Sequence, residues 1–347
     1  MNIKPRFFLG ANSENGFVSY FKQLQEQDRS MQLLILKGGP GSGKSTLMKN
    51  VLRFAEEKGH ILEIIPCASD PDSLDAFIDY TAGFSMMDGT SPHTEDPTIP
   101  GARHHILYTG ALWDSRKLSE KYDEIKKLTD DVGACHKGAT SYIRAAVSLL
   151  SENKQYAKDF LRKKETIDFA EKVISHLSGG KNGVETKRLL SAVSVGEIKQ
   201  FTDTVSFYAD KIYIIEDSFG AASDFIMKTV ALSARLKGEN YIYCPCSVMP
   251  DKCDHLIFPK SRTALVTKNN FLDFSKGETV SGFYNDMPFE SDMKKRLGLA
   301  QKLLSQGCAL VKKAKNIHDD LEAYYKDAMC FENFDDLFRD ITERFYV

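Results

Sequence analysis

Residues 33–46 read LLILKGGPGSGKST and contain each part of a phosphate-binding P-loop. The apolar run at 33–36 predicts a buried parallel strand, and an amphipathic helical pattern follows the loop. Glycines allow the backbone to turn tightly and to direct its N–H groups toward an anion. A match to G-x-x-x-x-G-K-[ST] between a strand and a helix predicts a nucleotide-binding site.

The residues of this loop have distinct expected roles toward a nucleoside triphosphate. A helix that begins at about Lys44 would place the positive end of its macrodipole beneath the phosphates. We expect Lys44 to bind the β- and γ-phosphate oxygens and the Ser45 hydroxyl to bind Mg²⁺, the predicted cofactor. The predicted nucleotide-binding residues are Gly38, Gly39, Pro40, Gly41, Ser42, Gly43, Lys44, Ser45 and Thr46.

Length, charge and cysteine content restrict the class of protein. A chain of 347 residues predicts about two domains, and a net charge of −2 gives no signal for nucleic acid or an anionic membrane. No apolar run approaches the roughly 20 residues that span a bilayer. The start at 1–6 leads into no signal-peptide region, and seven cysteines, an odd number, are typical of reduced thiols. We therefore expect a cytoplasmic protein without a membrane span.

The sequence repeats itself at a distance of 179 positions. Residues 33–88 then lie on 212–267 without a gap, so that Pro66 meets Pro245 and Asp75 meets Asp254. The identities fall at the expected ends of strands and helices, where backbone geometry is most demanding. An internal duplication of one α/β module explains this pattern.

The predicted fold is therefore α/β, with two tandem P-loop NTPase-like modules. Each should have a small, mostly parallel sheet, flanking helices and a helical hairpin, because long amphipathic stretches follow both cores. We expect an active module at 1–180 and a degenerate module at 184–347, with the glycine-rich run 178–183 as the linker.

The second copy lacks the phosphate-binding chemistry of the first. The gap-free alignment places Asp217, Ala222, Ser223 and Asp224 opposite Gly38, Gly43, Lys44 and Ser45, while Gly220 meets Gly41. Two carboxylates at a phosphate site would repel a triphosphate. We therefore predict that the second copy does not bind nucleotide.

Asp88 is the candidate second ligand of the magnesium ion. It ends an apolar segment that reads as a strand, and its counterpart in the second copy is Thr267. The carboxylate is thus lost together with the counterparts of Lys44 and Ser45, as expected if the three serve one ion. Lys44 and Asp88 are the predicted catalytic residues, and Ser45 and Asp88 the predicted metal ligands. The alternative is that Asp88 only opens a turn.

The loop after Asp88 has no equivalent in the second copy. It contains His93, and His104 and His105 follow it. A loop found only in the intact copy is a reasonable place for groups that position substrate or water, and His93 is the best candidate. The alternative is an ordinary exposed histidine.

These segments together resemble a family of bacterial P-loop ATPases. The residues that carry the resemblance are the P-loop, the turn Cys67–Asp75, the run Asp88–His93 (DGTSPH) and Pro100–Ala102 (PGA). In that family two P-loop modules are fused in one chain, and the resemblance covers nearly the full length. Its members are described as predicted ATPases or nucleotide kinases, which implies nucleotide binding but no pathway. Members can carry a recognisable P-loop in the second half too, and this sequence departs from them there.

Three functions fit these features, and Mg-dependent ATP hydrolysis is the favoured one. A small-molecule or nucleotide kinase is the alternative; it would need an arginine-bearing lid, for which Arg103, Arg116 and Arg144 are candidates. A non-catalytic nucleotide sensor is the third. ATP is the expected ligand and GTP an alternative, and the partner is an unknown protein or a small-molecule acceptor.

We also expect the two copies to pack against each other. A basic residue of the second copy, with Lys260 or Arg262 as the nearest guess, would then approach the triphosphate.

Overall fold

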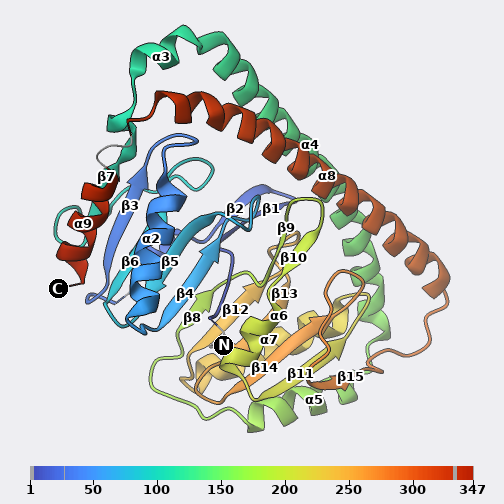
Figure 1. Cartoon of the computed structure of the whole chain (residues 1–347). Coiled ribbons are helices and arrows are strands. Elements are labelled where there is room, and N and C mark those ends of the chain that lie inside the picture. Colours follow the sequence, from blue (N-terminus) through green and yellow to red (C-terminus); the bar gives the residue numbers. More distant parts are fainter. Residues whose placement is uncertain (1–3, 27, 331–333, 347) are drawn as a thin grey trace.

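The computed structural model describes residues 4–26, 28–330 and 334–346. Its two main sheets have five and six strands, and helices cover them, so the expected α/β class is confirmed (Figure 1). Two short antiparallel pairs lie beside them: β1 (Gly10–Ser13) with β2 (Gly16–Ser19), and β9 (Ser191–Val193) with β10 (Ile198–Gln200).

The first sheet has the strand order β4-β5-β6-β3-β7. Its strands are β3 (Gln32–Lys37), β4 (Leu62–Pro66), β5 (Leu74–Asp79), β6 (Phe84–Asp88) and β7 (His104–Tyr108). β3 is parallel to β6 and β7, whereas β5 is antiparallel to both of its neighbours. Helix α2 (Lys44–Glu57) begins at the predicted residue.

Both faces of β3 are buried, which explains its unbroken apolar sequence. Leu34 and Leu36 pack with α2 and with α9 (Phe334–Phe345). Leu33 and Ile35 point to the other face, where Phe21 and the short helix α1 (Lys22–Gln25) cover them. The strand that leads into the P-loop is therefore fixed from both sides.

The second sheet has the strand order β15-β11-β14-β13-β12-β8. Its strands are β8 (Glu185–Lys187), β11 (Lys211–Glu216), β12 (Tyr241–Pro245), β13 (Cys253–Phe258), β14 (Thr263–Lys268) and β15 (Glu278–Val280). β11, β12 and β13 begin and end 179 positions after β3, β4 and β5, and β14 begins 179 positions after β6. A register irregularity follows Ile65 in one sheet and Cys244, 179 positions later, in the other.

Helices also cover both faces of this second sheet. α5 (Lys163–Ser175) and α7 (Ala221–Leu236) cover one face, and α6 (Thr202–Tyr208) covers the other. The N-terminal segment joins α6 there, because Phe7 and Phe8 are buried in the same cluster.

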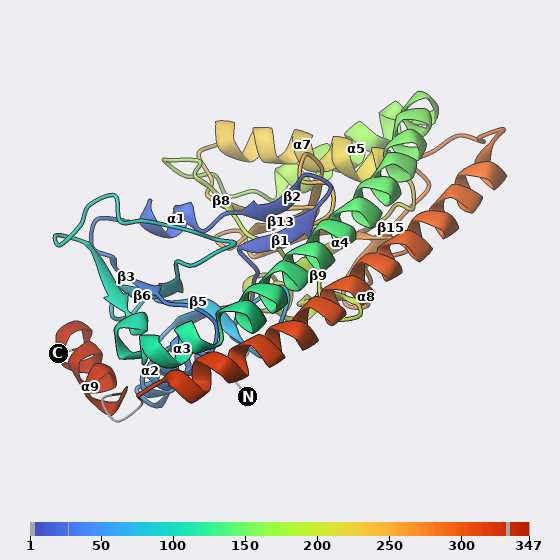
Figure 2. The same cartoon turned by 90° about the horizontal axis from the view of Figure 1, so that it is seen from above.

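The two longest helices pair with each other across the molecule, and the expected hairpin within each module is wrong. α4 (Tyr122–Ala157) follows the first sheet, α8 (Glu290–Ala328) follows the second, and they run side by side (Figures 1 and 2). Ile143 and Val147 of α4 share a buried cluster with Leu304 and Val311 of α8. Periodicity shows that a helix has an apolar face, but not which helix covers that face.

Residues on the two sides of the expected boundary at 178–183 pack against each other. The division into modules at 1–180 and 184–347 stays a prediction. α9 packs on the first sheet, whereas Phe8 of the N-terminal segment pairs with Leu189. A buried ion pair between Arg188 and Glu63 also joins the two halves.

Near the P-loop, the 3-10 turn Thr109–Leu112 and helix α3 (Ser115–Glu120) connect β7 to α4, and the 3-10 turn Lys158–Phe160 follows α4. In the described part of the chain, no helix is both long and apolar enough to cross a membrane.

Candidate functional site

The P-loop connects β3 to α2 and leaves the N-terminus of α2 open. The N-cap residue is Gly43, whose φ of 78° lies in the left-handed region that glycine adopts most easily. It has no side chain to cap the helix, and no other side-chain cap is made there. Because the first N–H groups of a helix have no partner within the helix, those of Lys44 to Thr46 remain available to an anion.

Lys44 lies across the loop that precedes it. Its side chain is nearly buried, and Nζ donates hydrogen bonds to the carbonyl oxygens of Gly38 (2.7 Å) and Gly39 (2.8 Å). The same Nζ lies 3.5 Å from Oδ2 of Asp88. The structure thus brings the two predicted catalytic side chains together.

Asp88 reaches this place because β3 and β6 are parallel neighbours, with Leu36 opposite Asp88. The carboxyl ends of parallel strands meet at one edge of a sheet, where ligands of α/β proteins usually bind. Oδ1 of Asp88 accepts hydrogen bonds from N (2.8 Å) and Oγ1 (2.5 Å) of Thr90. Asp88 therefore opens a turn and also lies beside Lys44. The Ser45 hydroxyl accepts a hydrogen bond from the Leu74 N–H at 3.0 Å.

Asp75 is a site residue that the sequence reasoning missed. It stands near the start of β5, which runs antiparallel to β6, so the start of β5 and the end of β6 lie at the same edge of the sheet. The carboxyl group is buried, and its burial together with the neighbouring Asp88 raises its pKa to about 8. The available signal was the match of Asp75 with Asp254, but the sequence did not reveal the strand direction.

His93 is buried at this edge and is not an exposed loop histidine. Its ring stacks on Phe21 at a centroid distance of 4.5 Å, and Nε2 lies 3.8 Å from Oδ1 of Asp75. Burial lowers the pKa of His93 to about 4, so the imidazole is neutral near pH 7. His104 and His105 face elsewhere: Nδ1 of His104 accepts a hydrogen bond from the Ile99 N–H, and His105 contacts Arg344.

Aromatic and backbone groups from distant segments cover the outer side of the P-loop. A methyl group added at Gly39 would lie 3.1 Å from the Trp113 ring and 3.4 Å from the Tyr325 ring. Trp113 lies just before α3, and its ring packs on the loop. Tyr325 belongs to α8, so the second half of the chain reaches the P-loop.

The loop between β11 and α7 of the second sheet covers 217–220, whereas the P-loop between β3 and α2 covers 38–43. The second loop is therefore two residues shorter, although the gap-free alignment implies equal lengths. α7 begins at Ala221, and its N-cap is Gly220, with a φ of 81°. Gly220 therefore takes the structural place of Gly43, and its predicted equivalence to Gly41 is wrong. A gap-free comparison cannot show this, because α7 gains at its start the two residues that the loop loses.

The N-terminus of α7 is closed by side chains of the chain itself. Oδ1 of Asp217 accepts hydrogen bonds from the N–H groups of Phe219 (3.1 Å) and Gly220 (2.8 Å), and Oδ2 accepts one from Ser223 (2.8 Å). The Tyr284 hydroxyl donates to Asp217 at 2.7 Å and accepts from the N–H groups of Ala221 and Ala222. A carboxylate and a hydroxyl thus hold the donors that α2 leaves open.

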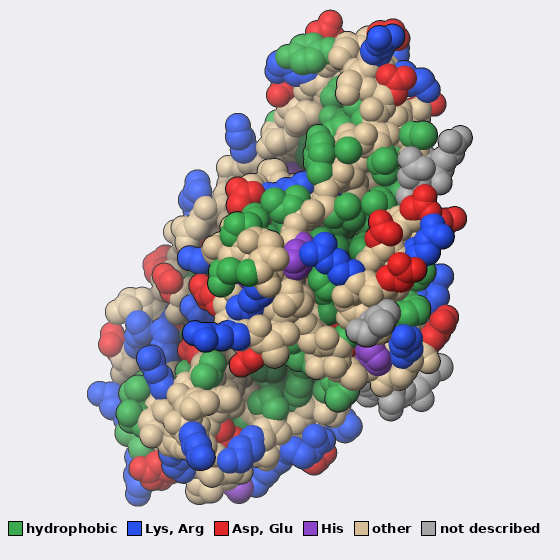
Figure 3. Space-filling view, turned by 90° about the vertical axis from the view of Figure 1, so that its left-hand side faces the viewer, with side chains coloured by type: hydrophobic (Ala, Val, Ile, Leu, Met, Phe, Trp, Pro, Cys, Tyr) green, Lys and Arg blue, Asp and Glu red, His purple; other side chains and the backbone are tan. Residues whose placement is uncertain are grey.

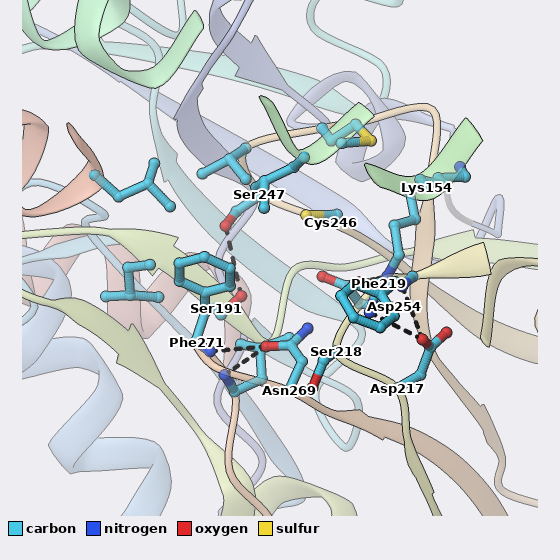
Figure 4. A pocket seen from close by; sticks show the side chains of 18 residues that line it. Lys154, Ser191, Asp217, Ser218, Phe219, Cys246, Ser247, Asp254, Asn269 and Phe271 are labelled. Carbon is cyan, nitrogen blue, oxygen red and sulfur yellow. Dashed lines mark hydrogen bonds and ion pairs between the residues drawn. The ribbon is translucent and has the colours of Figure 1, made fainter. Parts of the chain in front are cut away.

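The second predicted carboxylate of this copy, Asp224, lies in the first turn of α7. It forms ion pairs with Lys154 of α4 (2.6 Å) and with Lys228 of α7 (3.0 Å). A cavity of about 60 Å³ lies beside the loop, and Figure 4 shows Asp217, Phe219 and Lys154 among its lining side chains. Pockets for drug-sized ligands have roughly 300–1,000 Å³, so this cavity is small for a ligand site.

The structure does not place the predicted basic groups of the second copy near the P-loop. Arg262 pairs with Asp210, and Lys260 donates to the Gly179 carbonyl oxygen. Of the three lid candidates, Arg103 and Arg144 donate to the carbonyl oxygens of Met31 and Glu14, whereas Arg116 is exposed in α3. On the side of the molecule that bears α9 and β7, acidic and basic side chains are interspersed (Figure 3).

One comparison with known proteins gives a partial match. The family model described as "Nephrocystin 3, N-terminal" matches residues 18–76, a stretch that contains β3, the P-loop and α2. No curated protein and no solved structure matches the chain. The chain is therefore similar to that family over less than a fifth of its length.

Proposed function

We propose that the chain binds one magnesium nucleoside triphosphate at residues 38–46 and hydrolyses it, and that the second copy binds none. The observation that carries this proposal is the contrast between two helix N-termini. Gly43 leaves the start of α2 without a cap, whereas Asp217 and Tyr284 occupy the donors at the start of α7. The two halves are then tandem P-loop modules of which only one retains its ligand, in line with the resemblance to fused bacterial P-loop ATPases.

The residues at the first site fit a magnesium ion that is bound together with phosphates. Mg²⁺ prefers oxygen ligands, keeps several waters and usually takes only one or two protein groups beside the phosphates. The Ser45 hydroxyl and the Asp88 carboxylate are such groups. Among the described residues no cluster of three or more His, Cys, Asp or Glu side chains could hold a metal, so a cage made of protein ligands alone is not proposed.

Hydrolysis would depend on position and charge rather than on covalent chemistry by the protein. The open N–H groups of α2 hold the β-phosphate, and the Lys44 ammonium balances the charge that develops on the transferred group. When bound, the ion supplies further positive charge at the phosphate oxygens. Asp88 and Ser45 would hold that ion, and the buried His93 and Asp75, which lie close enough to Asp88 to feel its charge, are the candidates to position water.

Transfer to a small-molecule acceptor remains the alternative to hydrolysis. It would require basic groups that close over the acceptor. Arg103 and Arg144 instead bond to backbone carbonyl groups, which counts against two of the three candidates, whereas Arg116 is exposed in α3. Hydrolysis stays the favoured reaction.

Calorimetric titration with Mg-ATP, followed by a phosphate-release assay, tests the proposal. We expect one site per chain and steady release of phosphate. Lys44→Ala should abolish binding, because it removes the charge at the phosphates, whereas Ser223→Ala in the second copy should leave binding unchanged. A stoichiometry of two, or binding that survives in Lys44→Ala, would contradict the proposal.

A further inference from the structure

Helix α7 presents exposed apolar side chains on its outer face. Phe225, Leu232 and Leu236 are 42%, 60% and 80% exposed, and we refer to these three side chains as the α7 stripe. Leu232 and Leu236 follow Phe225 by seven and eleven residues, which places all three on one side of the helix, along about three turns or ~16 Å. α7 covers the second sheet from outside, so the stripe is part of the molecular surface (Figure 2).

The first copy shows that the fold does not require apolar residues at these positions. The buried residues of α2 from 47 to 55 recur, 179 positions later, as the buried residues of α7 from 226 to 234. In this register the three positions of the stripe correspond to Thr46, Arg53 and Glu57, which are exposed and polar. Scattered apolar residues are normal on a surface, whereas a contiguous group marks an interaction site. The α7 stripe is therefore a candidate docking surface.

The first copy also shows which kind of element packs on such a helix. The amphipathic helix α9 lies against α2, where Phe338 meets Phe54 edge-on at 6.1 Å. In α7 the position of Phe54 is taken by Ser233, and the exposed apolar side chains lie on the neighbouring stripe. A stripe about three turns long fits the apolar side of another amphipathic helix.

Basic side chains border the stripe along one side. Lys228 and Arg235 are exposed next to it on the helix surface. Asp224 pairs with Lys228 at 3.0 Å and with Lys154 at 2.6 Å, so this group of three keeps one positive charge. Acidic residues on a docked helix would complement this side of the stripe.

Two other occupants fit these charges less well. An antiparallel pair of α7 helices from two copies would bring the two basic sides together, which costs energy. Basic patches that recognise anionic lipid contain about four to eight Lys or Arg residues, more than border this stripe.

We propose that the α7 stripe docks an amphipathic helix of a partner protein, with acidic residues opposite Lys228 and Arg235. This role is separate from nucleotide binding. It would give the second copy, in which the start of α7 is closed by Asp217 and Tyr284, a function in partner recognition.

Fluorescence anisotropy with designed peptides tests this docking on the full-length protein. The probe is a fluorescein-labelled peptide of about four helical turns, with leucines along one side, glutamates at its edges and alanines elsewhere. A second peptide has the same composition in an order that gives no apolar side, and a third has lysines in place of the glutamates. Leu232→Ser removes the centre of the stripe. Leu299→Ser is the matched control, because Leu299 is a 50% exposed leucine on α8.

We expect the acidic amphipathic peptide to bind at one site per chain. Leu232→Ser should weaken this binding at least about tenfold, since burial of a leucine side chain contributes that much or more. Leu299→Ser should leave the affinity near the wild-type value, and the peptide of altered order should not bind. Arg235→Glu should weaken binding of the acidic peptide and strengthen binding of the lysine peptide, because it reverses the charge beside the stripe.

Other results would overturn the proposal. If the acidic peptide does not bind, or if Leu232→Ser leaves its binding unchanged, the stripe does not dock such a helix. A wild-type dimer in analytical ultracentrifugation that Leu232→Ser converts to monomers would assign the stripe to a second copy. Sedimentation with phosphatidylserine vesicles that is lost in Leu232→Ser would assign it to a membrane surface. Circular dichroism spectra and thermal unfolding establish that each variant is folded.

Discussion

Asp217→Ala should destabilise the protein by removing the group that closes the N-terminus of α7. Asp217 is 1% exposed and accepts hydrogen bonds from three backbone N–H groups and from the Tyr284 hydroxyl. Each buried donor left without a partner costs about 1–3 kcal/mol. The adjacent cavity of about 60 Å³ can admit water that restores some of these bonds. We therefore expect the free energy of unfolding to fall by about 3–5 kcal/mol, which is large for a single substitution.

The same variant should gain an anion site that the wild type lacks. With the carboxylate removed, the N–H groups of Phe219, Gly220 and Ser223 point at a vacant place near the positive end of α7. Sulfate bound there stabilises the folded state, by about 2.7 kcal/mol at a concentration of 100 times its Kd. Sulfate can also bind at the first P-loop, but that contribution is common to both proteins and cancels in the difference.

Urea unfolding followed by circular dichroism measures both effects, in sodium sulfate and in sodium chloride of equal ionic strength. The control is Asp210→Ala, which removes an exposed carboxylate paired with Arg262 and should cost less than about 1 kcal/mol. A loss below about 1 kcal/mol for Asp217→Ala would refute the view that its carboxylate closes the helix. A sulfate response equal to that of the wild type would refute the expected anion site.

Two further predictions concern the first site. Asp88→Asn should leave metal-free nucleotide binding nearly intact but reduce turnover by about two orders of magnitude, as for a lost electrostatic stabiliser; unchanged turnover would make Asp88 an ordinary turn residue. Asp75 should make stability depend on pH, because its pKa is raised to about 8 by burial and by Asp88. The folded state keeps this proton while the unfolded state loses it above about pH 4, so the free energy of unfolding should fall between about pH 4 and 8. Asp75→Asn should remove that part of the decline in thermal unfolding measured against pH, and an identical profile would contradict the assignment.

The parts of the structure that depend on local sequence were predictable. The apolar run of β3, the glycines of the loop and the start of α2 at Lys44 all lie within one short segment. The strand that ends at Asp88 was predicted for the same reason, and the repeat then indicated β11 to β14 of the second sheet, but not β8 or β15.

Features that depend on contacts between distant segments were not predictable in the same way. Asp75 enters the site because β5 runs antiparallel, and Phe334 reaches the P-loop only through the packing of α9. The equivalence of Gly220 with Gly43 was hidden because a shorter loop and a longer helix preserve the total length. The pairing of α4 with α8 joins two amphipathic helices whose sequences name no partner.

The long stretch of sequence between α2 and α9 has a consequence for how the protein is made. About 290 residues separate Gly43 from Phe334, and at ~5–20 residues per second a ribosome needs about 15–60 s to add them. During that interval the apolar side of α2 that α9 later covers, including Phe54, faces water or other proteins. Aggregation of the nascent first half, or its protection by chaperones, is therefore decided before α9 emerges from the ribosome.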